Sequence, residues 1–228
     1  MSSGPADPPP EWSNAAIVEL LTAERLRSYF AATNGEITEV MRLYEWNTDA
    51  AAAVISLISM TEVIVRNALD SALTNWSRRR HPSVSWLDAV PLDARGRADI
   101  AQARERATRR RPHGVHGKVI AELPFGFWRF LTASRYLTTL WIPALAAAFP
   151  HGHHDLGQRR KLVEQRMQRL SFVRNRAAHH EPIHQRDLAR DVNDAATLMG
   201  WVSPDAAGWV RAHEHVTAIY LRKPQVRH

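Results

Sequence analysis

The sequence predicts an all-α fold, and three observations lead to this prediction. Apolar residues recur at three- and four-residue spacings along most of the chain. No run of alternating apolar and polar residues is long enough for a strand, and only 10 of the 228 residues are Gly. Because 45% of the residues are hydrophobic and 8 are Trp, a substantial core can form. We expect a single helical domain over residues 13–225, after a loose Pro-rich segment over residues 1–12.

The first half of the chain is predicted to contain two helices. Ser13-Asn14 can cap a helix that runs to about Thr33, and Asn34-Gly35 then breaks it. A long helix follows over residues 37–76, and Asn47-Thr48 is a candidate interruption. Its apolar positions approximate one face of a helix: Leu43, Trp46, Ala50, Ala53, Leu57, Ile64, Ala68 and Leu73.

The second half alternates basic and apolar segments. Arg78-Arg79-Arg80 and His81-Pro82 end the long helix. Residues 92–108 are predicted to form a polar helix, and residues 108–118 a basic loop. The remaining segments are a dense apolar region over 119–149, a His-rich loop over 151–155, and helices over about 156–180, 184–200 and 204–222.

Composition restricts the function classes. The absence of Cys excludes disulfides, zinc–thiolate sites and Cys nucleophiles. The net charge of +7 favours binding to polyanions, although a high Arg content is also typical of proteins from GC-rich genomes. The N-terminus lacks the pattern of a signal peptide, and the apolar stretch over residues 140–149 is about half a bilayer span. We therefore expect a soluble, cytoplasmic protein that has no membrane partner.

The segment from Leu170 to Pro182 is the main candidate site. If it is helical, one apolar stripe contains Val163, Met167, Leu170, Val173 and Ala177. Arg174 is predicted to lie inside this stripe, where its guanidinium needs a partner. That partner is a carboxylate such as Glu62 or Glu181, a carbonyl, or a bound phosphate.

Two histidines follow Arg174 at the predicted end of the helix. Asn175 and His179 are one turn apart, as are Arg176 and His180, so the side chains of each pair can meet. Pro182 predicts that the helix ends near His180, where the helix dipole favours protonated imidazoles. A guanidinium and an imidazole are the parts that metal-free RNA cleavage needs, as phosphate clamp and as general acid or base. The structural alternative is that Arg174 forms an ion pair and the histidines merely cap the helix.

A family resemblance favours the catalytic interpretation. Arg174-Asn175-x-x-x-His179-His180-Glu181-Pro182 resembles the signature of Abi-like (abortive infection) proteins and fits the wider HEPN motif, an Arg followed by four to six residues and a His. Leu43-Tyr44-x-Trp46-Asn47 and Glu62-x-x-x-Arg66-Asn67-Ala68 resemble the family's N-terminal half. Residues 117–128 resemble its middle, with Pro124 where Ser is more usual. The resemblance covers roughly residues 20–222.

The resemblance implies a HEPN-like helical bundle with additional helices, a homodimer with a composite active cleft, and RNA as the substrate. It places catalysis on Arg174 and His179, supported by Asn175, and His180 is the second choice for the imidazole. The implied activity is a metal-independent endoribonuclease that leaves a 2′,3′-cyclic phosphate and needs no cofactor. The implied role is a toxin in antiphage defence, held in check by an antitoxin protein or a noncoding RNA. The alternative is a catalytically inactive RNA-binding module that scaffolds a regulatory RNA or a partner, and a DNA-binding regulator ranks third.

Other residues have weaker functional interpretations. Glu62 and Arg66 can form an intrahelical ion pair, or Arg66-Asn67 can order the catalytic helix or contact RNA, with His180 and Glu181 also in support. The predicted RNA-binding residues are Arg109, Arg110, Arg111, Lys118 and Arg176, which Arg78–Arg80, His113 and His116 can extend.

No metal is expected, because the His-rich loop lacks the spacing of a metal site at His151, His153, His154 and Asp155. The aromatic residues over 125–131 and Trp141 are predicted to be core, with part of that surface at a dimer interface.

Overall fold

The computed structural model describes residues 12–108 and 115–225, and it confirms the predicted all-α class. The protein is 77% helical and has no strand among the described residues. The helices are α1 Asn14–Leu21, α2 Ala23–Ala32, α3 Ile37–Arg80, α4 Trp86–Ala89, α5 Ala94–Thr108, α6 His116–Glu122, α7 Phe125–Leu131, α8 Leu156–Ala178, α9 Leu188–Val202, α10 Pro204–His213 and α11 Val216–Leu221. Between α7 and α8 lie the short turns η1 Ser134–Tyr136, η2 Leu137–Trp141 and η3 Leu145–Ala148.

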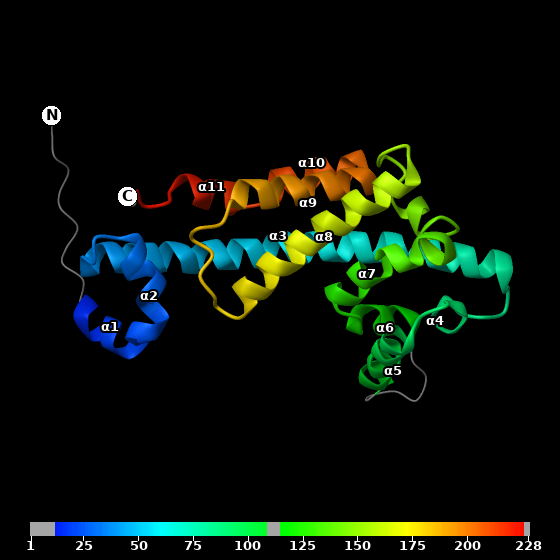
Figure 1. Cartoon of the computed structure of the whole chain (residues 1–228), viewed down its shortest axis with the longest axis horizontal. Coiled ribbons are helices and arrows are strands. Elements are labelled where there is room, and N and C mark those ends of the chain that lie inside the picture. The colour runs from blue at the N-terminus through cyan, green and yellow to red at the C-terminus, as the bar shows by residue number, and fades with distance from the viewer. Residues whose placement is uncertain (1–11, 109–114, 226–228) are drawn as a thin grey trace.

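Helix α3 is the axis of the molecule, and the other elements pack along it (Figure 1). Helices α1 and α2 fold back at its N-terminal end, α4 and α7 lie against its C-terminal part, and α5 and α6 pack together on the far side of α7. Helices α9, α10 and α11 run alongside α3, while α8 crosses it obliquely. This crossing brings the end of α8, which carries the predicted motif, against the first half of α3.

The prediction of an interruption in α3 was wrong, because the helix runs unbroken for 44 residues. Asn47 stays in the helix since its side chain faces the core, where Oδ1 accepts a hydrogen bond from the Ile183 amide. The Thr48 hydroxyl donates to the Tyr44 carbonyl within the same helix. Glu36 caps the start, and the helix ends at Arg80, with His81 as the C-cap just before Pro82.

The buried face of α3 is partly shifted from the predicted one. Ile64 and Ala68 are only half-buried, and the stripe instead continues through Thr61, Val65 and Leu69. The other six predicted positions are buried: Leu43, Trp46, Ala50, Ala53, Leu57 and Leu73. Over a helix of this length the buried face is set by the elements that pack against each turn. A single apolar stripe predicted for the whole helix is therefore wrong near its middle.

The predicted single helix before residue 33 was also wrong, because it is divided into α1 and α2. Thr22 separates the two helices with φ 68° and ψ 150°, outside the helical region. Gly35, with φ 79°, forms the predicted break before α3. The predicted helix over 204–222 is similarly divided into α10 and α11, on either side of Glu214-His215.

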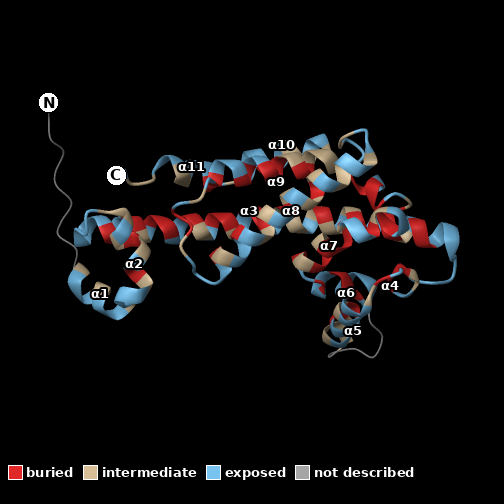
Figure 2. Ribbon diagram, in the orientation of Figure 1, coloured by how far each residue is buried: buried red, intermediate tan, exposed pale blue. Residues whose placement is uncertain are grey.

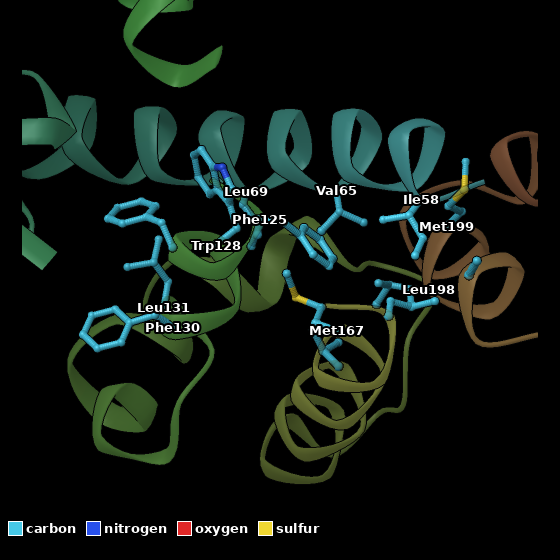
Figure 3. Close-up of a cluster of buried hydrophobic side chains, with 14 of the residues drawn as sticks. Ile58, Val65, Leu69, Phe125, Trp128, Phe130, Leu131, Met167, Leu198 and Met199 are labelled. Atoms are coloured by element: carbon cyan, nitrogen blue, oxygen red, sulfur yellow. The ribbon is translucent and has the colours of Figure 1, made fainter. Parts of the chain in front are cut away.

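One core joins α3, α7, α8 and α9 (Figure 3). The predicted stripe of α8 is confirmed, since its buried residues are Val163, Met167, Leu170, Val173 and Ala177. The aromatic residues of α7 and Trp141 are buried as predicted. Figure 2 shows buried turns (red) along α3 and α9, whereas α1 has none and is exposed (pale blue) or intermediate (tan). Between α8 and α9, Arg169 donates twice to the buried Asp194 carboxylate, with Nη2 2.7 Å from Oδ1.

Helix α3 is also long and apolar enough, by length and composition, to cross a membrane. The prediction from the sequence considered only the apolar stretch over residues 140–149. The core helix of a soluble protein has the same character, and α3 is the helix on which the core is built. The finding is compatible with a soluble protein.

Candidate catalytic cavity

A cavity of about 750 Å³ lies between α2, α3 and the C-terminal end of α8. Its charged and imidazole-bearing lining residues are Arg25, Glu62, Arg174 and His180. The rest of the lining is Tyr44, Asn47, Thr48, Ala51, Ala52, Ile55, Ile58, Ser59, Ala177 and Ala178. Since α8 crosses α3 here, residues more than a hundred positions apart in the sequence share one wall.

Arg174 lies at the rim of this cavity, and the prediction that it is buried in the apolar stripe was wrong. Its side chain is exposed, because a long side chain at the edge of a stripe can extend to solvent. Its only side-chain hydrogen bond within the described chain is from Nη1 to Asn175 Oδ1, at 3.4 Å. Neither Glu62 nor Glu181 forms a salt bridge with it among the described residues. The guanidinium therefore keeps most of its donors for a ligand.

The two histidines have different positions relative to the cavity. His179 is the C-cap of α8, and its amide donates to the Asn175 carbonyl at 2.9 Å. Its side chain is exposed and does not line the cavity. His180 lines the cavity together with Arg174, and its φ of 57° is left-handed, a conformation that costs free energy in residues other than Gly.

The segment that follows α8 is fixed by side chains from four parts of the fold. Arg25 of α2 donates to the His180 carbonyl, and Arg176 of α8 donates to the Pro182 carbonyl at 2.7 Å. Asn47 of α3 accepts from the Ile183 amide at 2.7 Å, and Lys223 near the C-terminus donates to the His184 carbonyl. These bonds explain how His180 is held in a left-handed conformation.

Glu62 adds a partly buried acid to the cavity. Burial raises the pKa of its carboxyl above the ordinary value, while the nearby Arg174 and Arg66 guanidiniums lower it and offset only part of the rise. The intrahelical ion pair with Arg66, one of the two interpretations left open by the sequence, does not form among the described residues, where Arg66 instead donates to Asn67 Oδ1 at 3.5 Å. The Arg66-Asn67 pair lies on α3 outside the cavity lining.

The other predicted supporting and RNA-binding residues are dispersed. Glu181 Oε2 is 3.6 Å from Arg176 Nη1, and neither residue lines the cavity. Lys118 is exposed on α6, as are Arg78–Arg80 at the end of α3. Arg109, Arg110, Arg111 and His113 lie outside the described residues. Among the described residues, no group of three or more His, Asp or Glu side chains could hold a metal ion.

Sequence reasoning did not identify Arg25 as a site residue and did not assign a role to Asn47. Nothing local marks Arg25, which reaches the motif across 155 positions of sequence. Asn47 carried a weak signal, because it is a polar residue beside Trp46 on an apolar helix face. A buried side-chain amide needs a hydrogen-bond partner, but its partner Ile183 cannot be identified from the sequence.

Comparisons with known proteins identify no relative of this chain. No family model, curated protein or solved structure matches the chain. The resemblance to Abi-like and HEPN proteins therefore rests on the motifs and stays a prediction.

Proposed function

We propose that the protein is a metal-independent endoribonuclease of HEPN type. The observation that carries the proposal is that one cavity is lined by both Arg174, whose guanidinium is exposed, and His180, which carries an imidazole. A guanidinium can donate two parallel hydrogen bonds to a phosphate, and an imidazole titrates near neutral pH. Together they match the needs of cleavage by the ribose 2′-OH.

In the proposed reaction, a base takes the proton of the 2′-OH, whose oxygen attacks the adjacent phosphorus. The bond from phosphorus to the 5′ oxygen breaks, an acid protonates that oxygen, and the product carries a 2′,3′-cyclic phosphate. Arg174 stabilises the negative charge that develops on the phosphate. Asn175 supports Arg174 through its Oδ1. Motif spacing favours His179 as the imidazole, whereas the cavity lining favours His180.

A homodimer follows from the same chemistry, because one imidazole cannot readily act as base and acid in a single step. A second copy of the motif across a two-fold axis would supply the missing group. Mixing inactive Arg174→Ala subunits with inactive His180→Gly or His179→Ala subunits tests this idea. Recovered cleavage supports a shared cleft, whereas no recovery despite proven subunit exchange counts against it.

The defence role rests on the motif resemblance. On this resemblance we propose a cytoplasmic toxin of abortive infection, which an antitoxin protein or a noncoding RNA neutralises. The position of His179 outside the cavity favours the second candidate function, an inactive module that binds and scaffolds RNA.

The experiment that separates the two functions uses labelled RNA in EDTA with wild type, Arg174→Ala and Arg211→Ala. Arg211 is an exposed arginine on α10, outside both the cavity and the motif, so it controls for loss of one positive charge. The endoribonuclease predicts cleavage by wild type and Arg211→Ala and loss in Arg174→Ala. If wild type and both variants bind the RNA and none of them cleaves it, the result would support the inactive RNA-binding scaffold.

A further inference from the structure

A second cavity of about 640 Å³ lies at the C-terminal end of α3 and shares no residue with the first. Helix α3 forms one wall, the loop before α4 forms another, and His116 of α6 closes the third. Its lining is Asp70, Ser71, Thr74, Asn75, Ser77, Arg78, Pro82, Ser83, Val84, Ser85, Trp86 and His116. The lining is therefore mostly polar, in contrast to the apolar floor of the first cavity.

The imidazole in this second cavity is held in a fixed orientation. Asp70 Oδ1 accepts from His116 Nε2 at 2.8 Å and from Trp86 Nε1 at 2.7 Å. Trp86 is fully buried, so it anchors the carboxylate, and the carboxylate orients the imidazole. His116 Nδ1 has no hydrogen-bond partner within the described chain and can meet a ligand.

The cavity also offers several donors that the described residues leave unused. Arg78 and Asn75 form no side-chain hydrogen bond within residues 12–108 and 115–225, and neither do the hydroxyls of Ser71, Thr74 and Ser83. Guanidinium, amide and hydroxyl donors are the groups with which proteins contact phosphate and sugar oxygens. Asp70 is the only acid in the lining, and it is paired with His116.

An uncovered face of α3 connects the two cavities. Between Glu62 of the first cavity and Arg78 of the second, successive turns present exposed or half-exposed side chains: Val63, Arg66, Asn67, Asp70, Ser71, Thr74 and Asn75. Their spacing of three and four residues places them along one side of the helix. At 1.5 Å per residue, the separation along the axis is about 24 Å. That length corresponds to roughly seven nucleotides of a stacked strand at 3.4 Å each.

We propose that the second cavity is an outer RNA site, which binds backbone phosphates several nucleotides away from the scissile bond. The identity of the ligand rests on the proposed ribonuclease function, whereas the site itself rests on the unused donors around Arg78 and His116. The Arg66-Asn67 pair lies on the path between the cavities and contacts the connecting strand. The substrate is then an RNA long enough to occupy both cavities.

The test compares Arg78→Ala with Arg79→Ala. Both residues are exposed members of one basic triplet, but only Arg78 lines the cavity, so the pair separates a specific contact from general surface charge. Cleavage of an RNA of about twelve nucleotides, long enough at 3.4 Å per nucleotide to reach both cavities, is measured beside cleavage of a dinucleotide. We expect Arg78→Ala to raise KM for the long RNA about tenfold, the loss of one charge-assisted contact, and to leave kcat unchanged. Cleavage of the dinucleotide should be unchanged, and Arg79→Ala should act less than about twofold.

Several results would overturn the outer site. If Arg78→Ala and Arg79→Ala raise KM for the long RNA equally, the effect comes from general surface charge. If Arg78→Ala lowers cleavage of the dinucleotide as much as cleavage of the long RNA, the effect lies in the first cavity or in the fold. A change in the monomer–dimer equilibrium without a change in RNA affinity would mean that a second copy covers this face. If wild type cleaves no RNA, the proposed function fails, but the dissociation constants of the two variants for the long RNA still decide the outer site.

Discussion

Asn47→Ala tests how the fold holds the segment that carries the motif. Asn47 is 4% exposed and Ile183 is 1% exposed, and the bond from the Ile183 amide to Asn47 Oδ1 measures 2.7 Å. Removing the acceptor leaves a buried amide unsatisfied, which costs about 1–3 kcal/mol. The gain in helix propensity from Asn to Ala, at most about 0.7 kcal/mol, offsets part of this loss. We expect the free energy of unfolding to fall by about 1–2 kcal/mol.

Denaturant unfolding measures this change, and Asn193→Ala is the matched control. Asn193 is exposed on α9 and forms no side-chain hydrogen bond to a described residue, so its replacement should leave stability unchanged or raise it by at most about 0.7 kcal/mol through helix propensity. Hydrogen exchange supplies the local readout, because the Ile183 amide should be protected in wild type and exchange faster in Asn47→Ala. Equal stability of the two variants, with Ile183 still protected, would refute the account of how the motif segment is fixed.

Three further predictions follow from the site. His180→Gly should lower cleavage by at least about a hundredfold and keep the fold. The reason is that Gly adopts the left-handed conformation at no steric cost, so only the imidazole is lost. If instead His179→Ala abolishes cleavage and His180→Gly does not, His179 is the catalytic imidazole, as the motif spacing favours. Burial raises the pKa of Glu62, so the stabilisation of its protonated form is complete below the unfolded pKa and is lost as pH rises through the folded value. Glu62→Gln should therefore gain stability over wild type on going from pH 4 to pH 7 in paired denaturant titrations, and a constant difference would contradict this. Burial lowers the pKa of His184 below its usual 6.5, so its contribution to stability is present above that value and is lost as pH falls through the folded pKa. His184→Gln should flatten the fall in thermal stability below about pH 6.5, and an unchanged slope would mean that other groups cause it.

The sequence predicted best where a short apolar pattern reports directly on a buried face. The five-residue stripe of α8 is an example, because every member is buried. The same stripe misled the placement of Arg174, since a helical angle fixes where a side chain starts and not where a long one ends. In α3 the predicted face drifted at Ile64 and Ala68 because the packing partner changes along so long a helix.

Parts of the site depend on contacts that no local pattern contains. The break at Thr22 depends on a positive φ, which a Thr in the sequence does not predict. The cavity exists because α8 crosses α3. The bonds from Arg25 to His180 and from Ile183 to Asn47 join positions 155 and 136 residues apart. The motif identified the candidate segment, but the tertiary contacts decide which of its two histidines lines the cavity.

Analysis of the ends of cleaved RNA tests the central claim most directly. The protein is incubated with RNA in EDTA, and the product termini are determined by mass spectrometry. Attack by the 2′-OH at the Arg174 cavity predicts 2′,3′-cyclic phosphate and 5′-hydroxyl ends with wild type and neither end with Arg174→Ala. Ends of 3′-hydroxyl and 5′-phosphate, or cyclic phosphate that Arg174→Ala forms at the wild-type rate, would contradict the account.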